Sequence, residues 1–344
     1  MKKIFITTFI FCAALSQAQD IHFSQYFESP VTLSPALTGT DKSYMRANLN
    51  YRNQWSIFGK GYQTMAFSFD MPLLRGKDKG SYLGAGLQVL NDKAGTTGLG
   101  RLNVAGSLSS IIKVGGTSLL SFGVQGSFNQ RSINTGNVRW DNQFDGTAYN
   151  ASLPSNENSG SQKKTFFDLG AGMAFIVNGN SDNMTSGDNF EMIAGGGVYH
   201  ITQPNVAFQG TDKTNMRYNG FLKMSFGIGS SNFSIQPTAG YWKQGSLQEI
   251  NVGSYFRYQL KSESQFTGFE RGMAVAFGTF YRVNDAFYPV LTFDYADYSI
   301  GVSYDINMSS LSPYSQGRGG FEIFLRFRDL NGLFGQGGMH KSFL

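Results

Sequence analysis

The chain has 344 residues and contains 43 glycines, 31 phenylalanines and 17 tyrosines, whereas only 15% of its residues are charged. Its formal net charge of +5 is mild and its basic residues are scattered, so the composition gives little support to a nucleic-acid partner. The single cysteine, Cys12, lies close to the N-terminus, which excludes a disulfide framework and a zinc-thiolate site from the rest of the chain.

Residues 1–19 have the features of a secretory signal peptide. Lys2 and Lys3 form a basic end, and residues 4–15 form an apolar core that is too short to span a bilayer. Small residues at 16 and 18 provide a cleavage site, so we predict a cleaved leader that exports the protein in a bacterium. Cys12 lies too deep in the apolar core to carry a lipid anchor.

Residues 20–42 are irregular and yet apolar. Pro30 and Pro35 each remove a backbone donor and favour an extended conformation in the residue before them, so no long helix or strand fits here. The segment nevertheless carries many apolar side chains, namely Ile21, Phe23, Tyr26, Phe27, Val31, Leu33 and Leu37. Such a segment must pack against something already built, and we predict an N-terminal strap that lies against or inside a larger β-structure.

Residues 43–330 alternate between apolar and polar side chains with a period of two. In the first strand, the apolar residues at 45, 47, 49 and 51 share one face and the polar residues at 46, 48, 50 and 52 share the other. The pattern recurs in about fourteen segments of about ten residues, the length that a tilted strand needs to cross a bilayer. The later segments are 61–71, 82–90, 101–112, 119–130, 165–177, 190–201, 216–228, 233–243, 247–258, 273–283, 287–295, 298–306 and 319–328.

Two all-β architectures fit this pattern: a soluble sandwich, which buries the apolar face between sheets, and a membrane barrel, which turns that face to lipid. The even spacing of the strands, without a dividing linker, favours the barrel. Glycines inside strands also favour it, because they allow curvature or the close approach of an interior segment; they include Gly84, Gly86, Gly170, Gly172, Gly195, Gly196 and Gly197.

Aromatic residues gather near the strand ends, as the interfacial girdles of a membrane barrel require. They are Tyr44, Tyr51, Trp55, Tyr62, Tyr82, Tyr241, Trp242, Tyr255, Tyr258, Tyr281, Tyr295 and Tyr298. We therefore predict a transmembrane antiparallel β-barrel of about fourteen strands over residues 43–330, followed by a C-terminal tail at 331–344.

Short turns alternate with long polar connections at Ser132–Lys164, Asn178–Asn189 and Lys261–Arg271. Long loops of outer-membrane barrels usually face outside, so we expect these three at the outer end. The first is the longest and carries Trp140, Phe144 and Tyr149, which makes it a candidate lid or docking surface.

Enzyme signatures are weak or incomplete. The glycine pairs at 84–86 and 170–172 lack the third glycine and the following helix of a dinucleotide site. The three histidines, His22, His200 and His340, lack the spacing of a metal site, and no G-x-S-x-G elbow is present. Oxygen-rich stretches at 141–146 and 182–188 do not fit a calcium loop and are typical of turns. We predict a non-enzymatic protein without a cofactor or catalytic metal.

Inward-facing arginines could line a pore or pair with inward-facing carboxylates across the lumen, and we favour pairing. The arginines are Arg46, Arg52, Arg101 and Arg217, and the carboxylates are Asp70, Asp168 and Glu249.

Three stretches resemble the PorP/SprF family of type IX secretion system membrane proteins from Bacteroidetes. They are the opening QDIHFSQYFESPVTLSPALTG with the later YRNQW, the loop segment Arg139–Phe144 (RWDNQF), and the block Gly197–Asn205 (GVYHITQPN). The resemblance implies an outer-membrane barrel that works beside the secretion machinery. It also implies that the partner is a large secreted or surface protein, such as a gliding adhesin, with a C-terminal signal domain. Members of the family also link the secretion complex to periplasmic peptidoglycan-binding subunits.

These motif residues are candidates for partner binding or for packing of the strap on the barrel. We expect the strap residues His22, Tyr26, Pro30 and Pro35 to pack near Arg52, Gln54 and Trp55, and Tyr199, His200 and Pro204 to close a neighbouring turn. Trp140 and Phe144 are the candidates in the long loop. A purely structural role for all of them stays open.

Two other functions stay open at the level of sequence. An outer-membrane solute channel would need an unplugged polar lumen, against which the apolar strap argues. A membrane-embedded hydrolase lacks any supporting Ser/His/Asp spacing. The sequence names neither the partner protein nor the oligomeric state.

Overall fold

The computed structural model describes residues 20–55, 61–76, 80–95, 98–135, 138–156, 161–178, 190–229, 231–261, 272–310 and 312–329. The predicted signal peptide and the predicted C-terminal tail lie outside the described residues.

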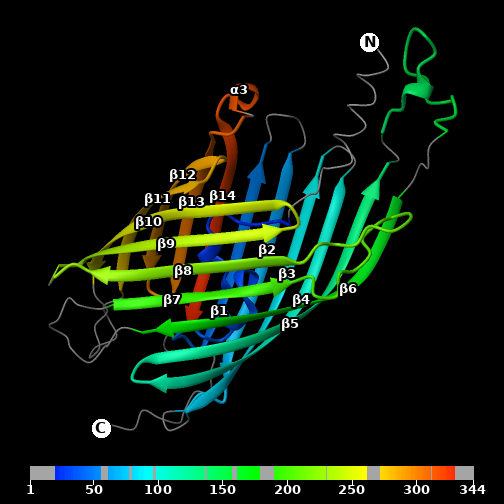
Figure 1. Cartoon of the computed structure of the whole chain (residues 1–344). Helices are drawn as coiled ribbons and strands as arrows, with labels where there is room; N and C mark the ends of the chain where they lie inside the picture. The colour runs from blue at the N-terminus through cyan, green and yellow to red at the C-terminus, as the bar shows by residue number, and fades with distance from the viewer. Residues whose placement is uncertain are drawn as a thin grey trace.

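Fourteen antiparallel strands form one closed barrel, as the alternating pattern predicts (Figure 1). Closure joins the first strand to the last, with Met45 opposite Asp329 and Gln54 opposite Gly320. The strands are β1 (Met45–Gln54), β2 (Tyr62–Leu73), β3 (Ser81–Ala94), β4 (Leu99–Gly115), β5 (Ser118–Asn134), β6 (Ser161–Val177), β7 (Phe190–Tyr199), β8 (Arg217–Gly227), β9 (Phe233–Gln244), β10 (Leu247–Lys261), β11 (Met273–Arg282), β12 (Ala286–Tyr295), β13 (Tyr298–Asn307) and β14 (Arg318–Asp329).

The two faces of the wall follow the predicted alternation. In β1 the polar residues at 46, 48, 50 and 52 are buried inside the barrel, whereas Leu49 on the other face is 40% exposed. Large apolar side chains such as Phe67, Leu108 and Leu291 are likewise exposed on the outer surface, which suits contact with lipid. Among the described residues, no helix is long and apolar enough to cross a membrane.

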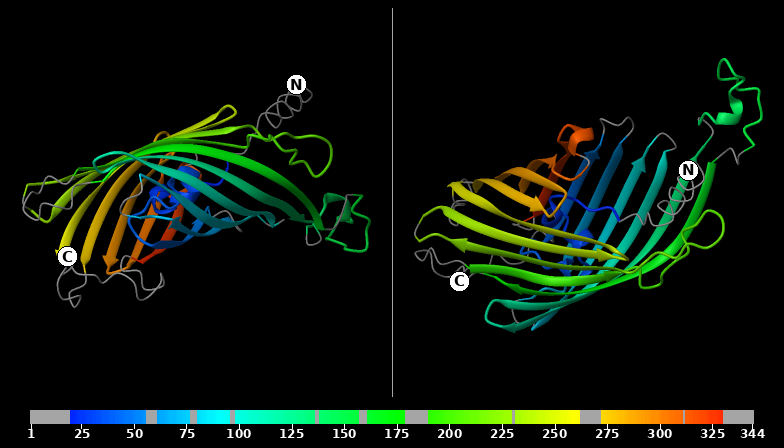
Figure 2. Two further views of the ribbon diagram at one scale, coloured as in Figure 1. Left: turned by 90° about the horizontal axis from the view of Figure 1, so that it is seen from below. Right: turned by 45° about the horizontal axis from the view of Figure 1, so that its top comes forward.

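The N-terminal residues run through the middle of the barrel (blue in Figures 1 and 2). We call residues 20–43 the luminal segment. It contains three short helical turns, η1 (Tyr26–Glu28), α2 (Pro30–Leu33) and η2 (Pro35–Leu37). Pro30 and Pro35 each occupy the start of a turn, where the missing N–H has no helical partner to lose. The prolines therefore divide the segment into compact pieces rather than one helix.

Aromatic side chains also fill part of the lumen. Tyr255, Phe280 and Tyr288 are buried inside β10–β12, and the rings of Phe280 and Tyr288 stack with centroids 5.2 Å apart. Tyr82 and Trp242 face inward as well and pack in a cluster with the luminal segment. The prediction that Tyr82, Trp242 and Tyr255 belong to an interfacial girdle is therefore wrong. Tyr82 and Trp242 cover the apolar surface of the interior segment, and Tyr255 packs with Phe280 and other inward wall residues.

The expectation that all three long connections share one end is also wrong. Antiparallel strands alternate in direction, so the β5–β6 connection lies at the end opposite to the start of β1. The connections that follow β6 and β10 join strands at the end where β1 starts. We call the end with the β5–β6 connection the far end (green loop at the upper right of Figure 1) and the other the near end.

Candidate functional site: the luminal segment and its polar latch

Two glycines of the barrel wall, Gly84 and Gly123, leave room for the backbone of the luminal segment, and we call them the glycine seat. A Cβ atom placed on Gly123 of β5 would lie 2.3 Å from the carbonyl carbon of Pro35. A Cβ on Gly84 of β3 would lie 2.3 Å from the carbonyl oxygen of Thr38. Both distances are far below van der Waals contact, so only glycine fits at these two positions. The predicted use of strand glycines for close approach is confirmed here.

Apolar packing surrounds this seat. Leu33, Ala36 and Leu37 of the luminal segment are buried in one cluster with wall residues. Fully burying a leucine side chain contributes about 1.5–3 kcal/mol. The wall residues in the cluster include Ile111, Leu119, Ala174, Ile176 and Phe221. The segment therefore occupies the lumen through hydrophobic contact as well as through polar anchors.

Wall side chains satisfy backbone groups that the irregular segment leaves unpaired. Ser121 Oγ donates to the carbonyl of Ala36 at 2.6 Å, and Asn219 Nδ2 donates to the carbonyl of Leu33 at 2.6 Å. The hydroxyl of Tyr199 also donates to Leu33, at 3.0 Å. Buried carbonyls need such partners, since an unpaired one costs free energy comparable to a lost hydrogen bond. Because these hydrogen bonds go to backbone carbonyls, they depend on the path of the segment and not on its side chains.

A buried charge cluster holds Ser24. The side chain of Glu322 accepts from the N–H of Ser24 at 2.7 Å. Asp305 accepts from Ser24 Oγ at 2.8 Å and pairs with Arg52 at 2.9 Å and with Arg282 at 3.3 Å. We call Ser24, Arg52, Arg282, Asp305 and Glu322 the Asp305 cluster. All five are 3% exposed or less, so each charge depends on its neighbours in the cluster.

Of the predicted arginine pairs, the structure contains the one between Arg46 and Asp70, at 2.8 Å. The same carboxylate accepts from the N–H of Gly39 in the luminal segment. The other arginines have different partners, because the luminal segment brings carboxylates of its own and the barrel brings distant strands together. Arg52 pairs with Asp305, Arg101 and Arg217 pair with Asp20, and Glu249 pairs with His22 and Arg282.

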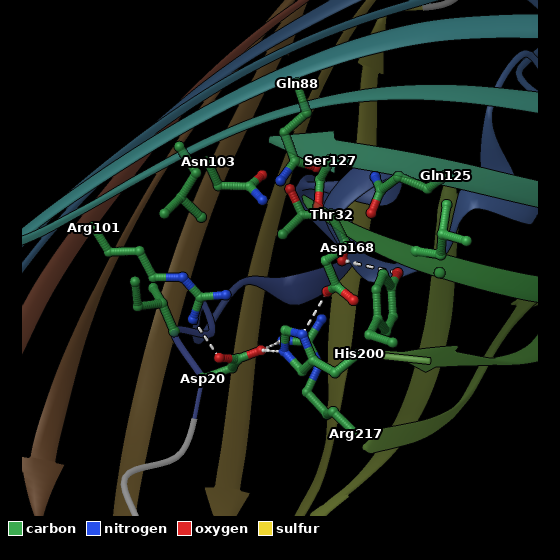
Figure 3. Close-up of a pocket in the computed structure, with 15 residues that line it drawn as sticks. Asp20, Thr32, Gln88, Arg101, Asn103, Gln125, Ser127, Asp168, His200 and Arg217 are labelled. Atoms are coloured by element: carbon green, nitrogen blue, oxygen red, sulfur yellow. Dashed lines mark hydrogen bonds and ion pairs between the residues drawn. The ribbon is translucent and has the colours of Figure 1, made fainter. Parts of the chain in front are cut away.

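The first described residue, Asp20, is held in a second cluster (Figure 3). Its carboxylate pairs with Arg101 of β4, with Arg217 of β8 at 3.4 Å, and with Nε2 of His200. The other ring nitrogen of His200, Nδ1, meets Asp168 of β6. We call Asp20, Arg101, Asp168, His200 and Arg217 the Asp20 latch. It fixes the start of the luminal segment at the far end, where β7 ends and β8 begins.

The surroundings of the Asp20 latch are polar. Thr202 donates to Asp168 at 2.9 Å, and the guanidinium of Arg217 lies 4.3 Å from the centre of the Tyr199 ring. A small cavity adjoins the latch, and its lining includes the amides and hydroxyl of Gln88, Asn103, Gln125 and Ser127 (Figure 3). The wall thus holds His200 and Arg217 in place through contacts that do not involve Asp20.

Two histidines at the contacts of the luminal segment have pKa values that are shifted in opposite directions. Burial lowers the pKa of His200, but the carboxylates of Asp20 and Asp168 outweigh burial and raise it, even against Arg217. Burial lowers the pKa of His22 to about 4, although Glu249 opposes this, so a neutral His22 donates Nε2–H to Glu249. At a pH of about 6.5, which equals the ordinary pKa of histidine, His200 is therefore charged and His22 is neutral.

These opposite pKa shifts predict that the combined contribution of the two histidines to stability is largest near pH 6.5. The raised pKa of His200 adds stability that is complete below about 6.5 and is lost as the pH rises through the folded-state value. The lowered pKa of His22 adds stability that is present above about 6.5 and is lost as the pH falls towards 4. Thermal unfolding in detergent between pH 5 and 9 measures this. His200→Gln should remove the alkaline loss only, and His22→Gln the acid loss only; a variant that removes both, or neither, contradicts the assignment.

The predicted site residues fall into two places. His22, Tyr26, Pro30, Pro35, Arg52, Tyr199 and His200 contribute to the luminal segment and its contacts. The expected contact with Trp55 is wrong: Tyr26 packs against Trp242, Pro35 against the glycine seat, and Trp55 against Tyr62. Of these segment residues, His22 contacts the end of β1, where its carbonyl accepts from Arg52.

Trp140, Phe144 and Pro204 lie outside this group, in far-end connections. Trp140 and Phe144 flank the turn η4 (Asp141–Gln143), and Phe144 is 58% exposed. The carbonyl of Pro204 accepts from the N–H of Thr214 within the β7–β8 connection.

Sequence reasoning missed Asp20, Arg282, Asp305 and Glu322. The last three lie on the inward face of predicted strands, so their position in the alternating pattern could have identified them. No pattern identifies Asp20, because an irregular segment has no period that reveals where a side chain points.

Comparison with known proteins identifies one family. A protein family described as type IX secretion system membrane protein PorP/SprF matches residues 15–327. No curated protein matches the chain. Among solved structures, the toluene transporter TbuX of Ralstonia pickettii is similar at 8% identity and a TM-score of 0.46, over 90% of this chain and 96% of that one. A FadL homologue of Pseudomonas aeruginosa is similar at 11% identity and a TM-score of 0.43, over 86% and 93%.

The family match covers nearly the whole described chain, and the closed barrel with an apolar outer surface is the architecture that such a protein needs in the outer membrane. The protein is an outer-membrane β-barrel that belongs to the PorP/SprF family of type IX secretion system membrane proteins.

Proposed function

We propose that this barrel supports type IX secretion by holding a large secreted or surface protein, such as an adhesin, through the C-terminal signal domain of that partner. The role needs no catalytic group. The observation that carries the proposal is the luminal segment, which occupies the interior through the glycine seat, the Asp305 cluster and the Asp20 latch. A barrel filled in this way is better suited to docking a protein than to passing solutes.

The described part of the β5–β6 connection, residues 138–156, supplies a structured surface for such docking. The amide of Gln143 donates to the carbonyl of Leu153 at 3.2 Å, and Asp145 accepts from the N–H groups of Thr147 and Ala148. These bonds keep the exposed ring of Phe144 on an ordered loop. Exposed aromatic residues on ordered loops favour protein contacts, since they bury large apolar area at little cost in conformational entropy.

The test is a pull-down of the tagged barrel from mildly solubilised outer membranes, with bound proteins identified by mass spectrometry. The proposal predicts recovery of a large secreted protein, and loss of that protein when its C-terminal domain is deleted. Recovery of periplasmic peptidoglycan-binding subunits alone would assign the barrel to a structural link in the secretion complex. A barrel that is recovered without partners, and that passes solutes in liposomes, would instead be a channel.

Trp55 provides a site-specific test at the far rim. Its backbone is in the left-handed region, with φ of 57°, and its ring packs edge-on against the exposed ring of Tyr62, with centroids 5.8 Å apart. We expect Trp55→Ala to leave heat-modifiable migration intact and to reduce surface display of the partner. Tyr298→Ala is the matched control, since Tyr298 packs on Phe327 at the near end. Loss of heat-modifiable migration in Trp55→Ala would make Trp55 structural instead.

A further inference from the structure

The Asp20 latch has the composition of a receptor for a carboxylate. Two guanidinium groups and an imidazole, from β4, β8 and the connection between β7 and β8, converge on one carboxylate. Charge-assisted hydrogen bonds of this kind are about twice as strong as neutral ones. The carboxylate that all three groups contact belongs to the luminal segment and not to the wall.

The wall positions two of these three cationic groups independently of Asp20. His200 is oriented by Asp168, which is itself held by Thr202. Arg217 lies over the ring of Tyr199. His200 and Arg217 are therefore in place before Asp20 arrives, as the groups of a binding site have to be.

The latch also has unused polar capacity. Among the described residues, Arg217 Nε and Gln88 Oε1 are buried without a hydrogen-bond partner. Both residues line the cavity beside the latch, together with the amides of Asn103 and Gln125. A ligand larger than one carboxylate would find donors and acceptors there, and buried groups of this kind favour a ligand that pairs them.

We infer that the Asp20 latch is an exchangeable carboxylate-binding site. Asp20 is its ligand while the luminal segment is seated, and an acidic side chain of an incoming partner polypeptide takes its place. The inference rests on the proposed function, which supplies the polypeptide. The side chains of Arg101 and Arg217 are only 24% and 14% exposed, so leaving both without a carboxylate is unfavourable and release of the segment alone is costly. Exchange of one carboxylate for another avoids that cost, and the location of the latch at the far end makes it reachable from that end.

Chemical rescue tests the receptor. The purified full chain carrying Asp20→Ala should unfold roughly 5 °C below the native protein at pH 7. Sodium acetate should restore most of this loss in a saturable manner, whereas sodium chloride at the same ionic strength should not. Acetate should not raise the unfolding temperature of the native protein, in which Asp20 already supplies the carboxylate, and adding Arg101→Ala should abolish the rescue. Equal effects of acetate and chloride would overturn the inference.

Exchange in the native sequence is tested with Ser29→Cys in a Cys12→Ala background, because Ser29 is buried in the luminal segment at 2% exposure. The capped peptide acetyl-Ala-Glu-Ala-amide should accelerate maleimide labelling of this cysteine at least severalfold. The matching glutamine peptide should not. Equal labelling with the two peptides would overturn the exchange. The acetate and labelling measurements involve no secretion partner, so their failure is distinct from failure of the pull-down.

Discussion

Replacing Gly123 by alanine is expected to unseat the luminal segment and open the barrel. The added Cβ would lie 2.3 Å from the carbonyl carbon of Pro35 and 2.4 Å from the nitrogen of Ala36. Backbone atoms cannot rotate away as a side chain can, so the segment must shift. Overpacking of this kind costs about 1–3 kcal/mol, and here the displaced element is the one that fills the lumen. Planar bilayer recordings should show ion conductance for Gly123→Ala and little for the native protein.

Gly106→Ala is the control for this experiment. Gly106 lies in the adjacent strand β4, and a Cβ placed on it would meet nothing within 4 Å. Its conductance and thermal unfolding should match those of the native protein. If Gly123→Ala and Gly106→Ala behave alike, the close approach at Gly123 does not hold the segment.

Removing Asp305 is expected to cause the largest loss of stability. Its carboxylate pairs with both Arg52 and Arg282, and the side chains of all three residues are 4% exposed or less. Asp305→Ala would leave two buried guanidinium groups short of a partner. Breaking a buried pair by removing one partner costs about 3–5 kcal/mol, because the remaining charge is uncompensated. The measurement is the temperature at which the barrel loses its heat-modifiable migration.

Asp285→Ala is a matched control, since Asp285 pairs with the same Arg282 at 2.8 Å. Its side chain is 43% exposed, so solvent screens the pair and its loss should cost about 1 kcal/mol or less. Similar losses in the two variants would mean that burial of the Asp305 cluster contributes nothing to stability.

The wall of the barrel was predictable from the sequence, and its strand lengths less so. Alternation identified the inward residues of β1, because a strand cannot keep a polar face in lipid. The predicted strand 119–130 is longer in the structure, where β5 extends from Ser118 to Asn134. The last residues of β5 do not alternate between buried and exposed side chains, and their sequence carries no alternating signal either.

The interior was predictable only in part. Proline and apolar residues showed that residues 20–42 must pack on a built structure, but not which side chains they meet. Arg52 pairs with Asp305, which lies more than 250 positions later in the chain. Closure of the barrel brings the two residues together, and Ser24 of the luminal segment donates to the same carboxylate. Tyr82 and Trp242 were assigned to the outer surface because strand-end aromatics are usual there. Their inward position follows from the luminal segment, whose path has no periodic signal.

The most direct test of a filled lumen is the accessibility of Ser29→Cys in a Cys12→Ala background. Ser29 is 2% exposed within the luminal segment, and Ser152 is exposed on the β5–β6 connection. The account predicts that a bulky polyethylene glycol maleimide labels Ser152→Cys rapidly in the folded barrel. It predicts that Ser29→Cys is labelled only after thermal unfolding. Labelling of both cysteines at the same rate in the folded protein would mean that the luminal segment does not occupy the barrel.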